Sequence, residues 1–242
     1  MKITEEENEF HICPPKLICD IPLSDAIPKM LPRVHHFLTI QGSPGSGKTS
    51  TMVSLLTSTG SNKAYRRVYE NIYFIMPPNS RASLANKIFE RHDPEKIYDE
   101  LTYENLQDIY TKIQHEASEG YNSLIVLDDV GASLKGGKSI EDLLKKIIWN
   151  RRHLHTSIWS IQQTYSSMPL SIRKSISHII ITGLPKNKRE YQSIFDELIH
   201  MNKEESDQIA NYTFKNKHDS LYIDIEGGKI YRNFNLLNIN GD

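Results

Sequence analysis

The feature that most constrains the fold is an alternation of short apolar segments with longer amphipathic ones, which begins at residue 37. The apolar segments have the length of strands: Phe37–Gln41, Asn71–Met76, Ser123–Leu127, Thr156–Ile161 and Ser177–Thr182. Between them lie segments with the spacing of amphipathic helices: Lys48–Ser58, Arg81–His92, Tyr103–Glu119, Ile140–His153 and Lys188–His200. Almost continuously apolar strands are typical of a parallel sheet that helices cover on both faces. The sequence therefore predicts an α/β fold with a mostly parallel sheet.

The two ends of the chain depart from this alternation. Residues 1–36 contain five of the 11 prolines, which disfavours long regular elements and predicts a Pro-rich N-terminal arm. Near the other end, two apolar segments at 220–225 and 230–234 flank the turn Glu226-Gly227-Gly228-Lys229, which predicts a C-terminal β-hairpin. We expect an arm over residues 1–36 and one domain over residues 37–242.

Charge and composition narrow the function classes. Lys and Arg number 29 against 30 Asp and Glu, so a basic surface over the whole molecule is excluded, although a local basic patch is not. No apolar run approaches the roughly 18 residues that cross a bilayer. The acidic start MKITEEENEF lacks the order of a secretory signal, so we expect a protein that is not secreted. Cys13 and Cys19 are too few for a disulfide framework, and their spacing from the nearby histidines matches no standard zinc pattern.

A glycine-rich segment follows the first strand and fits the pattern G-x-x-x-x-G-K-[ST] without a mismatch. Glycines let backbone N–H groups approach phosphate oxygens, and the following helix adds the partial positive charge of its N-terminus. An ordinary glycine-rich turn would explain the glycines but not a Lys-Thr pair at the register where both are useful. We predict nucleotide contacts along the segment: Gly42, Ser43, Pro44, Gly45, Ser46, Gly47, Lys48, Thr49 and Ser50.

Two carboxylates close the apolar strand at 123–127. Ligands of such sheets bind at the carboxyl ends of strands, so Asp128 is placed to hold Mg²⁺ beside the Thr49 hydroxyl, with Lys48 on the β- and γ-phosphates. Asp129 could orient or deprotonate the attacking water. Two acidic turn residues without a ligand are the alternative.

The strand at 156–161 ends in Gln162-Gln163, and an amide there could contact both the γ-phosphate and the attacking water. Before this strand stand Arg151 and Arg152, and Arg173 follows it. An arginine from a neighbouring subunit can neutralise charge in phosphoryl transfer. Cations at a helix C-terminus are also favoured by the helix dipole alone, so both explanations stay open.

The segment from Gly131 to Ser139 carries two lysines and no aromatic residue, and we expect a flexible loop. Lys135 and Lys138 could contact DNA phosphates without reading bases if the loop faces a channel. The alternative is a solvent-exposed loop that makes no contact with DNA.

Three stretches together resemble the genome-packaging ATPases of nucleocytoplasmic large DNA viruses and virophages, in the FtsK–HerA branch of P-loop NTPases. They are GSPGSGKT, LIVLDDV and NRRHLHTSIWSIQQTYSSMPLSIRKSISHIIITG. The resemblance implies a RecA/ASCE-like fold that hydrolyses ATP with Mg²⁺, forms a homo-oligomeric ring and pumps double-stranded DNA into a preformed capsid at a vertex. It also implies a location in the host cytoplasm, in viral factories, or in the virion.

The same resemblance assigns roles by motif position. Lys48 and Thr49 would contact phosphate and Mg²⁺, and Asp128 would be the carboxylate on the metal side. Gln163 matches a sensor position and Arg152 the arginine of an Arg-His pair. Asp129 stands where the branch usually has a catalytic Glu, so the sequence departs from the family pattern at this position.

Three other functions are alternatives to an ATPase. Asp128 to Gly131 also satisfies D-x-x-G, and Asn187 to Glu190 comes near the guanine-reading motif N-K-x-D, which would make the chain a GTPase. Glu190 is one carbon longer than the Asp that reads guanine. A small-molecule kinase would need an acceptor pocket and a lid rich in arginines. A nucleotide-dependent assembly or scaffold protein without motor activity is the alternative from another class.

Overall fold

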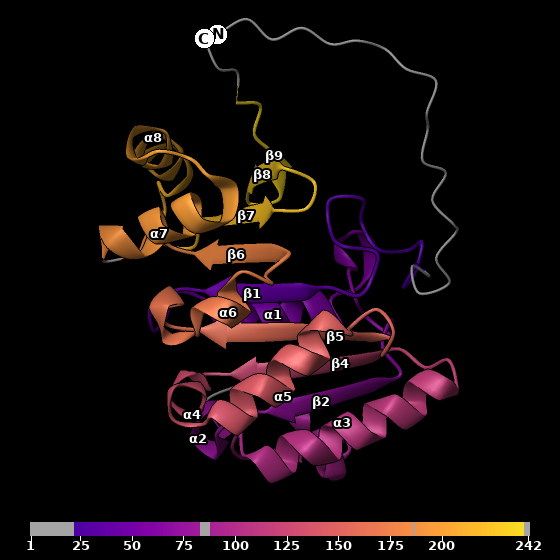
Figure 1. Ribbon diagram of the computed structural model, residues 1–242. Helices are drawn as coiled ribbons and strands as arrows, with labels where there is room; N and C mark the ends of the chain where they lie inside the picture. The colour runs from indigo at the N-terminus through magenta and orange to yellow at the C-terminus, as the bar shows by residue number, and fades with distance from the viewer. Residues whose placement is uncertain (1–21, 83–87, 186, 240–242) are drawn as a thin grey trace, which may run out of the picture.

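The computed structural model describes residues 22–82, 88–185 and 187–239. Their strands form one sheet in the order β3-β2-β4-β5-β1-β6-β7-β8-β9 (Figure 1). Pairing is parallel from β3 to β6 and antiparallel from β6 to β9. The bounds are β1 Phe37–Gln41, β2 Asn71–Ile75, β3 Ile97–Tyr98, β4 Ser123–Asp128, β5 Thr156–Gln162, β6 His178–Thr182, β7 Ser220–Asp224, β8 Lys229–Arg232 and β9 Asn235–Leu236.

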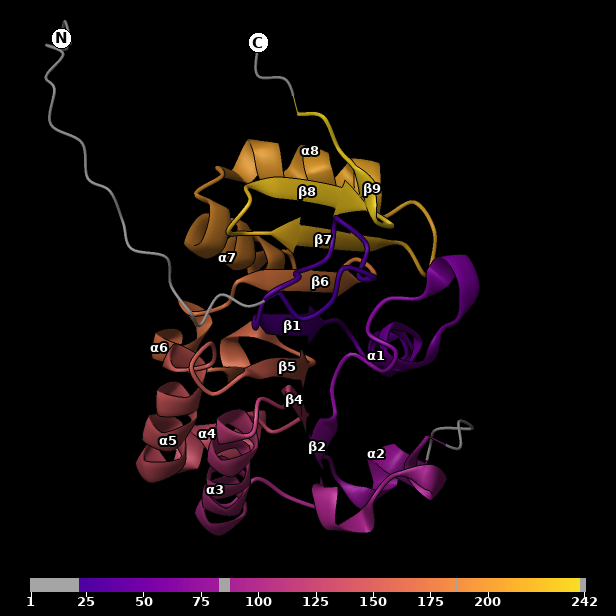
Figure 2. The ribbon, with the colours of Figure 1, turned by 90° about the vertical axis from the view of Figure 1, so that its right-hand side faces the viewer.

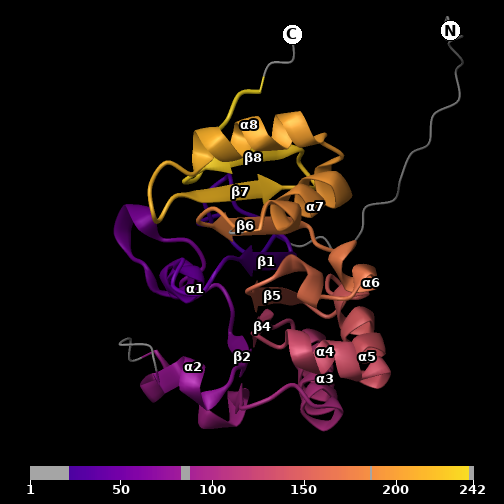
Figure 3. The ribbon, with the colours of Figure 1, turned by 90° about the vertical axis from the view of Figure 1, so that its left-hand side faces the viewer.

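Helices cover both faces of this sheet (Figure 3). They are α1 Lys48–Thr57, α2 Pro78–Ala82, α3 Tyr103–Ser118, α4 Gly131–Gly136, α5 Lys138–Trp149, α6 Leu170–Arg173, α7 Lys188–Ile199 and α8 Lys203–Thr213, with short 3₁₀ turns at Gly60–Asn62, Phe89–Arg91, Pro94–Lys96 and Tyr165–Ser167. One core packs α1 against the sheet around Met52, Trp159 and Phe74. The other packs α3, α5 and α7 around Ile109, Ile147 and Ile194. The predicted α/β architecture with a terminal hairpin is confirmed.

Every residue of β1, β4 and β5 is buried, because successive side chains of these strands alternate between the two cores. The register pairs Gln41 with Gln162 and Asp128 with Ile161, so the carboxyl ends of β1, β5 and β4 stand side by side. Since β5 lies between β1 and β4, whatever follows β5 sits between the segments that follow the other two strands.

Several element predictions were wrong in detail. The loop expected over residues 131–139 is mostly helical, because Leu134 is buried in the core and draws α4 onto the sheet. The helix expected from Arg81 to His92 is α2 and a 3₁₀ turn at the two ends of that range, and residues 83–87 lie outside the described residues. Helix α5 ends at Trp149 rather than at His153.

Helix α8 was not predicted at all. Its sequence is mostly polar, and only one face is buried, through Ile209 and Ala210. A signal for it was present, since Asn202 and Glu205 form a capping box in which each side chain accepts from the other's backbone N–H.

Residues 22–36 form no helix or strand but pack firmly on the core. Leu23, Ile27 and Leu31 are buried with the α1 core, and the Tyr65 hydroxyl donates to the carbonyl of Pro32. Figure 2 shows this segment lying across the ends of β1 and its neighbours. Cys13 and Cys19 lie outside the described residues.

Candidate nucleotide site

The segment between β1 and α1 has the backbone that its glycines predict. Gly45 and Gly47 have φ values of 75° and 103°, which L side chains rarely adopt. Gly42 is required for a different reason, since a Cβ there would collide with the Ser46 hydroxyl and with Thr182. The Ser46 and Thr182 hydroxyl oxygens lie 2.7 Å apart, which ties the loop to the end of β6. The loop is therefore fixed from both sides, by β1 and by β6.

Lys48 begins α1 and extends along the loop. Its Nζ donates to the carbonyl of Ser43 at 3.2 Å, and the side chain is half-buried. Burial lowers the pKa of Lys48, whereas the carboxylates of Asp128 and Asp129 oppose that shift. The ammonium group is thus close enough to both carboxylates to interact with their charge.

Asp128, the last residue of β4, is only 5% exposed. The pKa of Asp128 is raised to about 6, by burial first and by the charge of Asp129 next, while the charge of Lys48 and a hydrogen bond from Ser80 oppose the rise. A buried carboxylate next to a second carboxylate is stabilised by a cation. Asp128 is therefore suited to a metal ion.

The residues that could hold Mg²⁺ are few. Within the described ranges no group of three or more His, Cys, Asp or Glu side chains is arranged to hold a metal ion. Mg²⁺ usually keeps several waters and takes only one or two carboxylates together with the phosphates of a nucleotide. Asp128 and the Thr49 hydroxyl in the first turn of α1 fit that mode of binding.

Asp129 and Gln163 form a pair beside this carboxylate. The Gln163 Nε2 donates to the Asp129 Oδ2 at 2.8 Å, and both side chains are exposed. Asp129 has a φ of 54°, in the left-handed region, and its backbone N–H still donates to the carbonyl of Ile161 on β5. The strained backbone turns the Asp129 side chain away from the line of β4 toward the end of β5. Strained residues of this kind cluster at functional sites.

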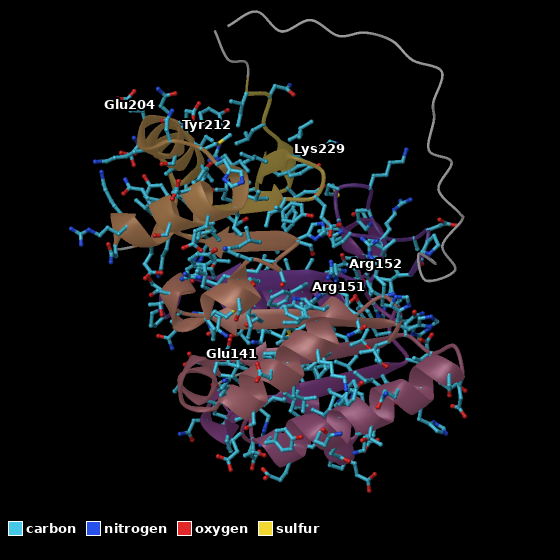
Figure 4. The ribbon with its side chains drawn as sticks, viewed as in Figure 1. Glu141, Arg151, Arg152, Glu204, Tyr212 and Lys229 are labelled. Carbon is cyan, nitrogen blue, oxygen red and sulfur yellow. The ribbon has the colours of Figure 1, made fainter. Side chains whose placement is uncertain are left out.

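Arg151 and Arg152 lie at the other edge of the sheet, before β5. Figure 4 shows the two side chains close together, at the end of α5 that is remote from Glu141. The Arg151 Nη2 lies 3.2 Å from the Glu226 Oε1, and the Arg152 Nη2 lies 3.9 Å from the Glu226 Oε2. Glu226 belongs to the turn between β7 and β8. Neither arginine reaches the glycine-rich loop between β1 and α1 of its own chain, because that loop lies at the carboxyl ends of the strands.

Arg173 has partners in the same chain, and so do Asn187 and Glu190 of the segment that comes near the GTPase motif N-K-x-D. Arg173 forms an ion pair with Glu197 at 3.1 Å and stacks on the Tyr165 ring. Asn187 caps the N-terminus of α7. The Glu190 carboxylate accepts hydrogen bonds from the backbone of the turn after Gln163 and from the Ser166 hydroxyl. Glu190 therefore supports that turn instead of facing an open base pocket.

The two lysines proposed for DNA lie on different helices. Lys135 is in α4, and Lys138 is exposed at the first position of α5. The short break at Gly137 separates them, so the flexible loop that was expected to carry both is absent from this part of the described chain.

Two residues of the site were not singled out from the sequence. Ser80 in α2 donates to Asp128, and Thr182 at the end of β6 meets the loop through Ser46. Both follow or close a strand of the parallel sheet, as Asp128 does. Position at a strand's carboxyl end was the signal that could have found them.

Comparison with known proteins agrees with this geometry. The family model described as Poxvirus A32 protein matches residues 29–214. Comparison with individually curated protein sequences finds no match. Among the described residues, no helix combines the length and the apolar character needed to span a membrane.

Solved structures of low sequence identity share the fold. B204, the DNA-packaging ATPase from Sulfolobus Turreted Icosahedral Virus, is similar with a TM-score of 0.58 at 12% identity, over 85% of this chain and 98% of that one. The genome packaging NTPase B204 from Sulfolobus turreted icosahedral virus 2, in complex with sulfate, gives 0.57 at 14% over the same shares. EssC (ATPases 2 and 3) from Geobacillus thermodenitrificans gives 0.60 at 15%, over 86% of this chain and 40% of that one.

The family model spans most of the chain, from the buried part of the arm through β6 and the helices that follow it. The strand order around the loop, the paired carboxylates and these matches agree with one another. The resemblance to viral genome-packaging ATPases of the FtsK–HerA branch is confirmed, and the chain belongs to the Poxvirus A32 protein family.

Proposed function

We propose that the chain is a Mg²⁺-dependent ATP hydrolase that moves double-stranded DNA into a preformed viral capsid. The observation that supports the proposal is the sheet geometry: Lys48 opens α1 after β1 and Asp128 ends β4, with β5 between the two strands, so that the charges of Lys48 and Asp128 interact. A lysine at a helix N-terminus binds phosphate, and a buried carboxylate beside it holds the cation that accompanies a triphosphate. B204 of similar fold is named a DNA-packaging ATPase, which supports the same use of the site.

The residues divide the work of hydrolysis. The loop from Gly42 to Ser50, with Lys48, would hold the phosphates, and Asp128 with Thr49 would hold Mg²⁺. When bound, Mg²⁺ neutralises charge on the phosphate oxygens. Asp129 accepts a proton from the attacking water or orients it, and Gln163 fixes the Asp129 carboxylate through their hydrogen bond.

The first experiment measures phosphate release from ATP with and without Mg²⁺ and duplex DNA. We expect hydrolysis that requires Mg²⁺ and rises with DNA. Phosphate release from GTP but not from ATP would favour the GTPase alternative. An inert protein in every condition would favour the assembly or scaffold protein and overturn the hydrolase. Substituting both Lys135 and Lys138 with Ala should weaken the effect of DNA and leave basal hydrolysis intact.

An arginine acting on a neighbouring subunit is the second part of the proposal. Arg151 and Arg152 lie at the edge remote from their own loop, so either one can serve only the site of another copy in a homo-oligomeric ring. We assign the role to Arg152, whose side chain is 37% exposed, rather than to Arg151, at 15%. Such arginines raise phosphoryl-transfer rates by about 10³-fold or more.

Mixing two inactive variants tests this assignment directly. Lys48→Ala removes the phosphate contact but keeps Arg152, and Arg152→Ala keeps the phosphate contact. Each variant alone should be inactive, whereas an equimolar mixture should recover part of the hydrolysis, because one subunit supplies the arginine to its neighbour's intact site. Arg189→Ala, at an exposed position on α7, is the matched control and should hydrolyse normally. An active Arg152→Ala protein, or a mixture that stays inactive, would contradict the assignment.

A further inference from the structure

A hollow of about 670 Å³ adjoins the loop on the side away from Asp128. The strand order places β4, with Asp128, to one side of β1, and β6 and β7 to the other side. A triphosphate whose terminal phosphate and cation point toward Asp128 must therefore extend its sugar and base toward β6 and β7. The hollow lies there, between α1, the end of β6 and the strands that follow it.

The aromatic side chain in this hollow is Phe234, in the turn between β8 and β9. Asn233 and Phe234 have φ values of 48° and 65°, as a two-residue hairpin turn of type I′ requires. Glycine is the preferred residue at the second position of such a turn, and a phenylalanine there is strained. Strain of this kind persists only where the surrounding structure holds it.

The surrounding structure holds this turn through its polar side chains. The Asn233 Nδ2 donates to the Asp219 Oδ1 at 2.8 Å, and the Asn233 Oδ1 accepts from the Ser220 backbone N–H at 2.7 Å. Asp219 is buried and also accepts from Arg232. The turn is thus fixed from β7 and β8 together, and its position relative to the loop is set by the sheet.

The Phe234 ring has support on one side and space on another. Its centroid lies 5.6 Å from that of the Tyr222 ring, which is fully buried. Phe234 lines the hollow beside the loop and also a smaller one, of about 280 Å³, together with Met30 and Leu31 of the N-terminal segment. A half-buried aromatic ring held in this way can stack on a planar ligand.

We propose that the base of the bound nucleoside triphosphate stacks on Phe234, with His218 and Ser220 at the rim of the same hollow. The inference rests on the proposed function, because it needs the phosphates on the loop. Stacking uses the face of a base and not its edge, so Phe234 adds affinity for ATP and GTP alike and does not choose between them.

Calorimetric titration of the full chain with ATP, GTP and inorganic tripolyphosphate tests the proposal, since tripolyphosphate has no base. Phe234→Ala should weaken ATP and GTP binding by about 10-fold or more and leave tripolyphosphate binding unchanged. Phe234→Leu keeps an apolar side chain without a ring and should behave like the alanine variant. Phe234→Trp should bind ATP at least as well as the wild type. Leu236→Ala, at an exposed apolar position two residues further on, is the control.

The outcomes separate this inference from the proposed function. Leucine and tryptophan variants that bind ATP equally well would overturn the stacking role, as would a Phe234→Ala protein with unchanged ATP affinity. A parallel loss of tripolyphosphate and ATP binding in a variant that melts like the wild type would also overturn it, because the ring would then act on the loop. A wild-type chain that binds neither ATP nor tripolyphosphate would overturn the proposed function and this inference with it.

Discussion

The two edges of the parallel sheet use their polar side chains in opposite ways. At the amino edge, the buried His36 is hydrogen-bonded on both ring nitrogens, to the carbonyl of Val34 and to the Trp159 indole N–H. At the carboxyl edge, Asp129 and Gln163 are exposed and bond to each other. The amino edge uses these polar side chains within the fold, whereas the carboxyl edge leaves Asp129 and Gln163 exposed to solvent.

The difference between the two edges indicates which polar side chains of such a sheet are candidates for function. Histidines are common in active sites, yet His35 and His36 here contact Asn122, Trp159 and neighbouring rings within the fold. At the carboxyl edge the side chains of Asp129 and Gln163 are exposed, and the pKa of Asp128 is raised by burial and by a second carboxylate. Perturbed groups with room for a ligand are better candidates than buried groups that are already paired.

The largest expected effect follows from removing the positively charged side chain of Lys48 at the carboxyl edge. Lys48→Ala should reduce ATP hydrolysis by about 100-fold or more, because the positive charge that meets the phosphates is lost. Phosphate release and nucleotide binding are measured on the same preparation. Lys63→Ala, at an exposed position beyond α1, should retain wild-type turnover. Normal turnover in the Lys48 variant would remove the basis for assigning function to this edge.

Two adjacent glutamines offer a finer comparison within that edge. Gln163→Ala should lower turnover by about 10-fold to 100-fold with little change in stability, because its amide meets only the exposed Asp129. Gln162 is fully buried, donating to the Ser160 hydroxyl and accepting from the Ser167 hydroxyl. Gln162→Ala should therefore lower the melting temperature instead. Steady-state hydrolysis and thermal unfolding of both variants check the division, and equal effects on turnover would contradict it.

Acid should lower the free energy of unfolding through His35 at the amino edge. The pKa of His35 is lowered from 6.5 to about 4, by burial first and by the charge of His155 next. The unfolded chain therefore binds a proton below pH 6.5 that the folded chain refuses until about pH 4, so stability is retained above 6.5 and lost as the pH falls through that interval.

Urea unfolding measures the size of this effect. Between about pH 7.5 and about pH 5.5, His35 should account for a loss of about 1 kcal/mol in the free energy of unfolding. His35→Gln should flatten that pH dependence by the same amount. His115→Gln, on the exposed side of α3, is the matched control and should leave it as in the wild type. An identical slope in the His35 variant would show that other groups set the acid response.

The smallest expected effect concerns the backbone of the carboxyl edge. Asp129 has a φ of 54°, which glycine adopts without strain and alanine does not. Asp129→Gly should unfold with a free energy about 0.5–1 kcal/mol higher than Asp129→Ala. Both variants lose the carboxylate and should lose hydrolysis equally, so the difference in urea unfolding isolates the strain. An alanine variant as stable as the glycine variant would show that the left-handed backbone is not costly here.

Much of the fold and the centre of the site could be predicted because each depends on local sequence. The loop pattern fixes where α1 begins, and the apolar run before Asp128 fixes a strand and its carboxyl end. These signals lie within a few residues of the features that they predict. The same holds for the terminal hairpin, whose turn residues lie between the two strands.

What could not be predicted depends on contacts between distant segments. Nothing near Phe234 in the sequence shows that its turn stands beside a loop at residue 45, since strand order alone brings them together. The support of the turn after Gln163 by Glu190 is likewise a meeting of separate segments. The lysine-bearing loop was predicted wrongly because its glycines outweighed the one large apolar residue, Leu134, which draws the segment into a helix.

The packing of residues 22–36 has a consequence for anyone who shortens this protein. Leu23, Ile27 and Leu31 cover the same apolar surface that α1 covers, and Arg33 donates to the carbonyl of Ile27 to keep the segment folded back on itself. A version cut at residue 37 would open that surface to water and invite aggregation. A shortened protein should accordingly retain residues 22–36, even though they belong to no helix or strand.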